Sequence, residues 1–398
     1  MPHRRGSRAP VARGGHGIIH TMRHRFVRRL ALLLIVSVLT FGLGELVVRL
    51  LFGSGSDATD FSFEPMNLTG TEERGRFRRH PTRFFELAPE YVHGPRHLGR
   101  YGLGAWHFRN TPPEPLAPGR LRVIVLGDSC MYGVGVDAAE TVPERLAAEL
   151  AARGLSRAQV QVLNLGVPGY STVQIEAMLD EALERWQPDG VVFYPAAWND
   201  QSPNVWRNDL QLERDATDPS VFMRLRRASR LVALLASRLE SVDTADVVER
   251  WAAGDPPLGH RVPAEETDRR LTRMYRTVQD AGLACVVITP IHPDSTQTAH
   301  PRVDRDARAV RRLASEAGLA VVGGPLDGVD ERSAHHDHLF VDYAHPSPEG
   351  TLRLAREAAE VLAPQLLERV ESAAGAGGLA IVSAEPDALS AFGDEQVR

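Results

Sequence analysis

Ser129 occupies a position at which a side chain can do nucleophilic chemistry. It follows the apolar segment Val123-Ile124-Val125-Leu126 and the connecting Gly127-Asp128, and it precedes a glycine-rich run. A serine at the carboxyl end of a parallel strand lies at the mouth of an open α/β sheet, where ligands usually bind. Gly-Asp-Ser alone is a weak signal, because average residue usage would produce it in about one chain in ten of this length. A nucleophilic role therefore depends on partners elsewhere in the chain.

A candidate base and a candidate acid lie together near the carboxyl end. Asp342 and His345 stand just before Pro346-Ser347-Pro348, and this segment predicts a loop that enters the last helix. If His345 accepts the proton of the Ser129 hydroxyl, Asp342 on the same turn can hold the imidazole in the required tautomer. One loop would then supply both the base and the group that orients it.

Two further segments can supply hydrogen-bond donors to an oxyanion. Asn164-Leu165-Gly166-Val167-Pro168-Gly169 follows a second apolar segment, and Ala197-Trp198-Asn199-Asp200 follows a third. Acyl transfer to a serine needs such donors, because the carbonyl oxygen of the substrate gains negative charge in the transition state. The chain therefore carries the residue types of a complete serine-hydrolase site.

With these segments in place, the chain resembles the SGNH or GDSL hydrolase family. The four residues that give the family its name fall on Ser129, Gly166, Asn199 and His345, in the family's chain order. The match runs from about residue 122 to about residue 366. By resemblance, Ser129 is the nucleophile, Asp342 and His345 complete the triad, and the oxyanion hole consists of the Ser129 amide, the Gly166 amide and the Asn199 side chain. The resemblance implies no metal ion and no organic cofactor.

Alternating strand and helix patterns predict an α/β fold. Such alternation implies a parallel sheet with helices on both faces, joined by right-handed crossovers. The resemblance implies a three-layer α/β/α sandwich with five strands in the flavodoxin-like order 2-1-3-4-5. The predicted strands are residues 122–126, 160–165, 190–194, 284–289 and 319–322. The predicted helices are residues 142–153, 172–186, 264–281, 304–317 and 348–372.

The amino terminus predicts a membrane segment. Residues 1–29 contain eight arginines and no acidic residue, and residues 30–44 are uncharged and mostly aliphatic. Glu45 and Arg49 can pair along one helix face, so the helix can continue beyond them and reach about 35 Å, enough to cross a hydrocarbon core of about 30 Å. We therefore expect one transmembrane signal anchor over residues 30–52.

The charge of the first residues predicts the orientation of this anchor. A basic flank stays in the cytoplasm, so the chain after the anchor lies outside it. We expect a single-pass protein of the inner membrane whose catalytic domain faces the periplasm or the cell exterior. The alternatives are a cleaved signal peptide, a buried core helix, and a true start at Met22 that would remove the first residues.

The rest of the chain divides into four parts. Residues 53–120 form a polar linker and an extended lead-in without clear periodicity, and residues 121–372 form the hydrolase domain. The segment 201–262 is too long for a plain connection between a strand and a helix. We expect it to be a helical cap beside Asn199, the alternative being a surface decoration that does not touch substrate. The tail at 373–398 is expected to be disordered.

Composition narrows the classes of partner and cofactor. A net charge of -5 gives no reason to expect nucleic acid as a partner. Cys130 and Cys285 fall in predicted strands or strand ends, which favours buried thiols over a disulfide. The run His335-His336-Asp337-His338 has no second cluster with matching ligand spacing, so a solvated loop is favoured over a metal site. His292 is expected at the mouth of the cleft, in contact either with substrate or with solvent alone.

Together these features predict a serine esterase of the cell envelope that works through an acyl-enzyme. Its partners would be the membrane and an acylated small molecule, glycan or lipid. We expect short acyl groups, such as O-acetyl groups of envelope carbohydrate, because Met131 and Tyr132 follow the nucleophile closely and the insertion is rich in arginine. The alternatives are an O-acetyltransferase of the same fold, a lipase or thioesterase, and a catalytically inactive binding protein. The sequence predicts no oligomeric state.

Overall fold

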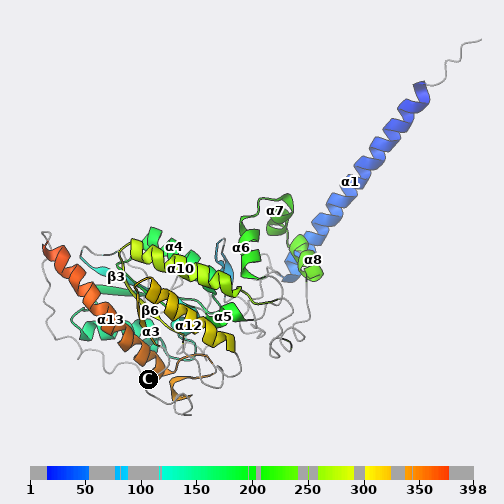
Figure 1. Cartoon of the computed structure of the whole chain (residues 1–398). Helices are drawn as coiled ribbons and strands as arrows, with labels where there is room; N and C mark the ends of the chain where they lie inside the picture. Colours follow the sequence, from blue (N-terminus) through cyan, green and yellow to red (C-terminus); the bar gives the residue numbers. More distant parts are fainter. Residues whose placement is uncertain are drawn as a thin grey trace, which may run out of the picture.

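In the computed structural model, five apolar segments form one parallel sheet (Figure 1). Its order is β4-β3-β5-β6-β7, which is 2-1-3-4-5 along the chain, so the predicted α/β fold is confirmed. Every residue of the first four of these strands is buried, which explains their lack of polar alternation. The strands are β3 (Leu121–Gly127), β4 (Val160–Gly166), β5 (Gly190–Phe193), β6 (Ala284–Ile288) and β7 (Ala320–Val322).

The structure describes most of the chain but not all of it. Its described residues are 16–52, 77–80, 82–87, 116, 119–195, 197–202, 208–240, 250, 259–290, 301–323, 337–342 and 344–375. His292, the pair His335-His336 and the tail from residue 376 lie outside these ranges, and so does most of the lead-in.

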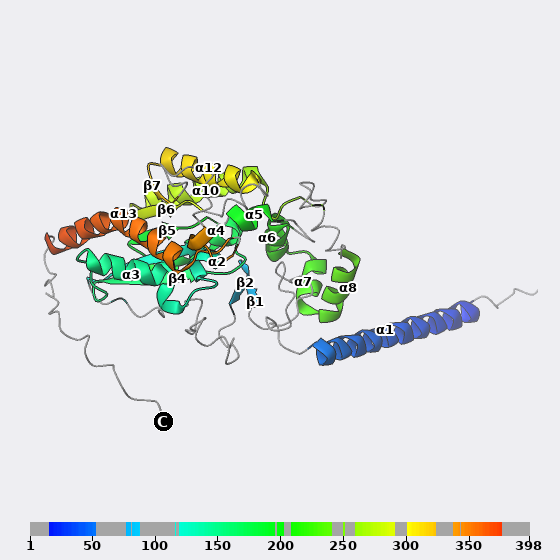
Figure 2. The ribbon, with the colours of Figure 1, turned by 90° about the horizontal axis from the view of Figure 1, so that it is seen from below.

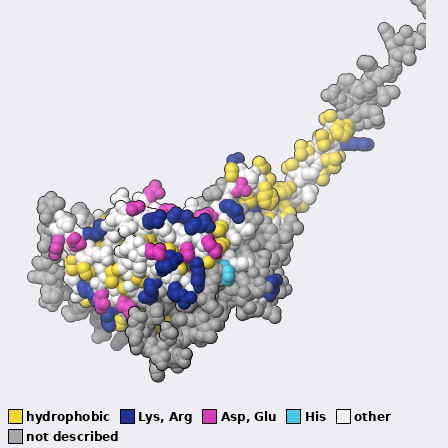
Figure 3. Space-filling view, in the orientation of Figure 1, with side chains coloured by type: hydrophobic (Ala, Val, Ile, Leu, Met, Phe, Trp, Pro, Cys, Tyr) yellow, Lys and Arg dark blue, Asp and Glu magenta, His cyan; other side chains and the backbone are white. Residues whose placement is uncertain are grey.

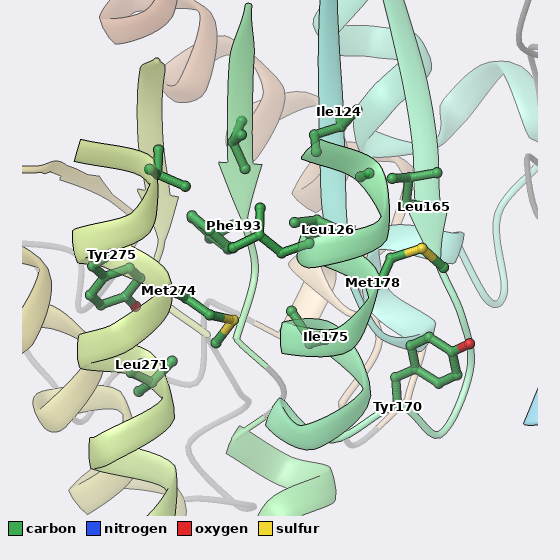
Figure 4. Packing of buried hydrophobic residues seen from close by; sticks show 14 of the residues in the cluster. Ile124, Leu126, Leu165, Tyr170, Ile175, Met178, Phe193, Leu271, Met274 and Tyr275 are labelled. Carbon is green, nitrogen blue, oxygen red and sulfur yellow. The ribbon is translucent and has the colours of Figure 1, made fainter. Parts of the chain in front are cut away.

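Helices cover both faces of the sheet and give three layers. Ile124 and Leu126 of β3 point into one core, which Figure 4 shows, while Val123 and Val125 point into the other. This division follows from the two-residue period of a strand. The helices over the first core are α4 (Thr172–Trp186), α10 (Ala264–Asp280) and α12 (Pro301–Glu316). Those over the second core are α3 (Val142–Ala152) and α13 (Pro348–Gly375).

The helix boundaries follow the sequence closely. α4 has the predicted bounds because Ser171 and Gln174 form a capping box at its start. α12 begins at Pro301, before the predicted start at residue 304, and proline is favoured in the first turn of a helix. α13 continues past the predicted end at Ser372 to Gly375, through two alanines that favour helix.

Part of the lead-in forms a small antiparallel hairpin against the domain. β1 (Phe77–His80) pairs with β2 (Phe84–Leu87), and Phe85 enters the first core. Arg83 in the turn is fully buried, and its guanidinium donates to Tyr170 Oη at 3.1 Å, to Glu86 at 2.9 Å and to Glu181. The predicted extended lead-in therefore includes an ordered hairpin that reaches the loop before α4.

One long helix lies outside the three layers. α1 (His16–Phe52) contains a 26-residue segment, Phe26–Leu51, that is long and apolar enough to cross a membrane. The carboxyl-terminal end of α1 lies beside α8 (Arg230–Glu240), as Figures 1 and 2 show. The shorter elements are α2 (Ser129–Tyr132), α5 (Ala197–Gln201), α6 (Asp209–Thr217), α7 (Val221–Ala228), and the 3-10 turns Ala138–Glu140 and Asp337–Leu339.

Candidate active site

The turn that carries Ser129 is tightly packed. A Cβ atom added at Gly127 would lie 2.5 Å from Met131 Cγ, so only glycine fits between β3 and α2. Asp128 caps α2, because its Oδ1 accepts a hydrogen bond from the Cys130 amide at 2.9 Å. Ser129 is thereby held as the first residue of α2, at the carboxyl edge of the sheet.

The structure brings the three predicted triad side chains together. His345 Nε2 lies 2.9 Å from Ser129 Oγ, and His345 Nδ1 lies 2.7 Å from Asp342 Oδ2. The serine hydroxyl can donate to Nε2 when Nδ1 carries the proton that bonds the carboxylate. This linear chain of two hydrogen bonds is the arrangement in which a histidine can deprotonate a serine.

A closed loop holds His345 in place. Phe340 and Pro346 form an antiparallel bridge, and the amide of Val341 donates to the His345 carbonyl at 2.9 Å. Asp342 Oδ1 accepts from the amides of Ala344 and His345, both at 2.8 Å. The carboxylate is thus fixed by backbone hydrogen bonds on one oxygen and orients the imidazole with the other.

Electrostatics keep this carboxylate ionised. Partial burial would raise the pKa of Asp342, but the hydrogen bond and charge of His345, together with two backbone amides, lower it to about 2. An ionised Asp342 stabilises the imidazolium that forms when His345 takes a proton. Burial raises the pKa of the neighbouring Cys130 well above its usual range, so this thiol stays protonated and is a poor nucleophile. Its Sγ lies 3.5 Å from the Ala344 carbonyl and ties α2 to the histidine loop.

A small open pocket lies in front of Ser129. Its cavity volume is about 100 Å³, smaller than that of most drug-sized ligand sites, so it suits a small group. The aromatic side chains Tyr194 and Trp198 form part of its wall. The lining residues are Asp128, Ser129, Cys130, Tyr194, Pro195, Trp198, Asn199, Pro290, Ala344 and His345.

Asn199 reaches this pocket from α5. Its Nδ2 donates to the Tyr170 carbonyl at 2.8 Å and to Asp128 Oδ2 at 3.1 Å. Asp128 is buried, and burial raises its pKa to about 6 against the opposing effects of the Cys130 amide and the His345 charge. The side chain of Asn199 is therefore held beside Ser129 by two acceptors.

A buried carboxylate fixes the position of α5. Asp200 accepts hydrogen bonds from the Thr172 amide at 2.8 Å, from the Thr172 hydroxyl at 2.7 Å and from the Thr267 hydroxyl at 2.7 Å. Burial raises the pKa of Asp200 to about 7 even though all three donors oppose the shift. Asp200 thus ties the helix that carries Asn199 to the starts of α4 and α10.

The Gly166 amide is not free for its predicted role in this structure. It donates to Asn164 Oδ1 at 2.9 Å. An added Cβ would lie 2.3 Å from the Tyr132 amide, so glycine is required here for close packing of β4 against α2. The amide is already used and cannot also bind an oxyanion in this conformation.

A second glycine on the same loop fits the donor role better. Gly169 has φ +82, a conformation that favours glycine, and precedes Tyr170, whose carbonyl accepts from Asn199. Within the described chain, the amide of Gly169 has no hydrogen-bond acceptor, and neither has the amide of Ser129. The sequence contains the signal, because Gly166 and Gly169 flank one turn. Only the backbone conformation distinguishes them.

None of the described helices of the insertion, α6, α7 and α8, contributes a lining residue to the pocket. The expected cap beside Asn199 stays a prediction. Met131 and Tyr132, which belong to α2, are buried and do not line the pocket. The described part of the insertion instead packs on the outside of the domain and against α1.

The described residues contain no cluster of three or more His, Cys, Asp or Glu side chains able to hold a metal ion. His338 is exposed, and its Nε2 lies 3.5 Å from Glu349 Oε1 at the surface. The free thiols of Cys130 and Cys285 are both buried, as predicted.

Comparison with known proteins agrees with the site. The sequence profile described as GDSL-like Lipase/Acylhydrolase family matches residues 125–352, a span that contains Ser129, Asn199, Asp342 and His345. No curated protein matches the chain at a significant level.

Several solved structures are similar to this chain at low identity and low TM-score. A lipolytic protein of the G-D-S-L family from Desulfitobacterium hafniense is 14% identical, covering 61% of this chain and 100% of its own, with a TM-score of 0.38. An acetyl xylan esterase from Geobacillus stearothermophilus is 16% identical over 61% of this chain and 95% of its own, with a TM-score of 0.40. A lipase/acylhydrolase from Enterococcus faecalis is 16% identical over 63% of this chain and 96% of its own, with a TM-score of 0.36.

Proposed function

Because the chain belongs to the GDSL-like lipase/acylhydrolase family, we propose that it is a membrane-anchored serine esterase acting on short acyl esters through Ser129, His345 and Asp342. The observation that carries the proposal is the hydrogen-bonded chain Ser129 Oγ, His345 Nε2, His345 Nδ1 and Asp342 Oδ2, with links of 2.9 and 2.7 Å. Ser129, at one end of this series of hydrogen bonds, lines a pocket that is open to solvent and large enough for a small acyl group.

The proposed reaction proceeds in two half-reactions. Ser129 Oγ attacks the ester carbonyl carbon while His345 Nε2 takes the hydroxyl proton. When the tetrahedral intermediate collapses, the bond to the alcohol oxygen breaks and His345 returns the proton to the leaving alkoxide. Water then attacks the acyl-enzyme with His345 as base, and collapse releases the carboxylic acid and restores the Ser129 hydroxyl.

We assign the oxyanion hole to the amides of Ser129 and Gly169 and to Asn199 Nδ2. Both amides have no acceptor in the described chain. Asn199 Nδ2 donates two hydrogen bonds, and the one to Asp128 Oδ2 is the longer, at 3.1 Å. On formation of the oxyanion, Nδ2 would donate this hydrogen to the oxyanion instead of to Asp128. Gly169 replaces the predicted Gly166 because the Gly166 amide is occupied.

The test of this mechanism is a pair of variants and a chemical probe. Ser129→Ala and His345→Ala should each abolish hydrolysis of a soluble acetyl ester, because the triad residues act as one unit and loss of either one removes its activity. Both variants should remain folded. A fluorophosphonate should label the wild type and not Ser129→Ala. Retention of more than about a tenth of wild-type activity in Ser129→Ala would exclude the mechanism, since triad losses are far larger. An unlabelled wild type would favour a binding protein without activity.

The acyl preference is tested by a series of esters. Acetyl esters should have higher kcat/KM than esters of eight or more carbons, because the pocket that the described residues form is small. In such a tunnel each buried CH₂ would add up to about 0.8 kcal/mol of binding. A kcat/KM that climbs steadily with chain length would assign the protein to lipases or thioesterases instead. Faster breakdown of the acyl-enzyme on addition of sugar acceptors would assign it to the O-acetyltransferases.

The proposed anchor is α1, with the catalytic domain outside the cytoplasm. The segment Phe26–Leu51 is almost entirely exposed, as a lipid-facing helix would be, and a basic stretch precedes it. Protease added to spheroplasts should reach the catalytic domain, and a carboxyl-terminal reporter that fluoresces only in the cytoplasm should stay dark. A bright reporter would overturn the orientation.

A further inference from the structure

A carboxylate in the apolar helix α1 binds the start of another helix. Glu45 Oε1 accepts from Arg49 Nε at 2.7 Å and from the Arg230 amide at 3.1 Å. Glu45 Oε2 accepts from Ser229 Oγ at 2.8 Å and from the Leu231 amide at 3.0 Å. The first amides of a helix have no partner within it, so Glu45 caps α8 from a different part of the chain.

The two helices are packed closely around this cap. A Cβ atom added at Gly44 would lie 2.9 Å from Leu231 Cδ2, so the absence of a side chain lets α8 approach. Val48 is 6% exposed, whereas the other large apolar side chains of the segment Phe26–Leu51 are 43–75% exposed. Arg49 Nη2 also donates to the Ala228 carbonyl at 3.3 Å. The hairpin made of α7 and α8 is therefore docked on the last turns of α1.

This hairpin presents an unusual apolar surface. Outside α1, five large hydrophobic side chains are exposed among the described residues, and four of these belong to the hairpin. Three of these side chains share one face of α7, because Leu225 lies four residues after Val221 and three after Phe222. Their exposed fractions are 72% for Val221, 54% for Phe222 and 49% for Leu225. Leu235 on α8 is 56% exposed. In Figure 3 apolar side chains gather where α1 meets the body of the molecule.

The hairpin is also strongly basic. Residues 221–240 contain five arginines and a single acidic residue, Glu240. Helices that combine an apolar face with arginines lie in the interface of membranes and favour anionic headgroups. An apolar face toward a protein partner would not need this charge.

The depth of Glu45 agrees with such a position. Counted from Leu30, the first residue after the basic flank, a hydrocarbon core of about 30 Å ends about twenty residues on, near Arg49. Glu45 then lies about 6 Å inside the outer boundary. An ionisable side chain there is costly unless it is paired, and the cap of α8 supplies four hydrogen bonds.

We propose that α7 and α8 form a membrane-contacting hairpin that lies in the outer headgroup region, with anionic phospholipid as its partner. The apolar face of α7 enters the bilayer surface, the exposed Arg224 of the same helix binds a lipid phosphate, and the Glu45 cap holds the catalytic domain close to the membrane. The proposal rests on the proposed anchor but is independent of the esterase activity.

Single-cysteine labelling of the full-length protein in vesicles tests the proposal. Both native cysteines are buried, so a fluorescent label reacts only at an introduced site. The test sites are Phe222→Cys and Leu225→Cys, the exposed Ser315→Cys on α12 is the water-facing control, and Leu33→Cys reports on the anchor. The vesicles contain phosphatidylcholine with phosphatidylglycerol, with doxyl-labelled lipid as the membrane quencher and iodide as the water quencher.

Labels at residues 222 and 225 should be quenched by doxyl lipid at least about twofold more than the label at 315, because an interfacial helix buries its apolar face about 5–10 Å into the boundary. Iodide should quench the label at residue 315 more than the labels at residues 222 and 225. Quenching by iodide equal to that at 315 would overturn the proposal, and so would protection from both quenchers, which would indicate a second protein on this face. If residue 33 also escapes the lipid quencher, the anchor itself fails, so the two failures are distinguishable.

Two further comparisons sharpen the result. Glu45→Ala removes the cap and should lower the lipid quenching at residue 222, whereas Ser37→Ala, on an exposed face of the same helix, should leave it unchanged. An equal response of both variants would overturn the role of the cap. Phosphatidylcholine alone should quench residue 222 less than the mixture does, and equal quenching in both would overturn anionic lipid as the partner.

Discussion

The hydrolytic site and the junction of α1 with α8 both depend on a carboxylate, but they are built differently. Asp342 lies on the same loop as the histidine that it orients, and Cys130 and the bridge between Phe340 and Pro346 fix that loop to the domain. Glu45 instead reaches across to a helix 184 residues away, at the edge of the molecule. The site is held by the core, whereas the junction is held by a few surface contacts. Hydrolysis and membrane attachment should therefore be separable by mutation.

The largest effect is expected at the site. Asp342→Asn keeps the shape of the side chain but favours the wrong histidine tautomer, so kcat should fall by about 10³–10⁴-fold. The measurement is kcat on a soluble acetyl ester, with the melting temperature as the control for folding. Activity within about tenfold of wild type would show that Asp342 does not orient His345.

The oxyanion donor should give the next largest effect. Asn199→Ala should lower kcat by about 10²–10³ while KM changes little, because the lost donor acts only in the transition state. A matched control is Asn208→Ala, which removes a cap of α6 and should cost stability of about 1 kcal/mol without changing kcat. An unchanged kcat with a raised KM in Asn199→Ala would make this residue a substrate contact.

Two carboxylates should give the stability of the domain opposite responses to pH. The pKa of Asp342 is lowered from 3.8 to about 2, so its contribution is complete above about pH 4 and is lost as pH falls toward 2. The pKa of Asp200 is raised from 3.8 to about 7, so the folded state binds more protons between those values and stability falls as pH rises through this range. Melting temperatures of Asp200→Asn should decline less than those of the wild type between pH 5 and pH 8. An identical decline would mean that Asp200 is ionised throughout.

The smallest effect is expected from the junction. Glu45→Ala should leave kcat/KM on a soluble acetyl ester within about twofold of wild type, since exposed contacts far from a site contribute little to its geometry. Ser37→Ala is the matched control. A tenfold loss of kcat/KM in Glu45→Ala alone would show that the site and the junction are coupled, and would remove the distinction between them.

The strand ends were predictable because their signals are local. Five apolar runs, each followed by a turn, predict the strands, and the family resemblance implies the order that the sheet has. Ser129 and Asn199 then follow strand ends at one edge of the sheet. Because these residues lie at the same edge of the sheet, they can contact one another. Their catalytic roles remain predictions. The choice between Gly166 and Gly169 depends on φ and on which amide is free, and neither can be read from residue type.

The position of the insertion was not predictable, for a different physical reason. Its arginines and apolar residues suit a cover over a polar substrate as well as a membrane surface, and the sequence pattern does not distinguish them. The deciding contact is between Glu45 and Ser229, which no local periodicity signals. The buried Arg83 is similar, because its partners Tyr170 and Glu181 lie far along the chain.

The cap on α8 also has a consequence for biosynthesis. α1 is made first, yet 184 residues separate Glu45 from Ser229. At translation rates of about 5–20 residues per second, those partners emerge only after about ten seconds or more. Arg49, which lies one turn away at 2.7 Å, is the partner available meanwhile. If α1 is the proposed anchor, the pair keeps this part of the helix electrically neutral while it enters the membrane, and the carboxylate can then receive α8 once residues 201–262 have been translated.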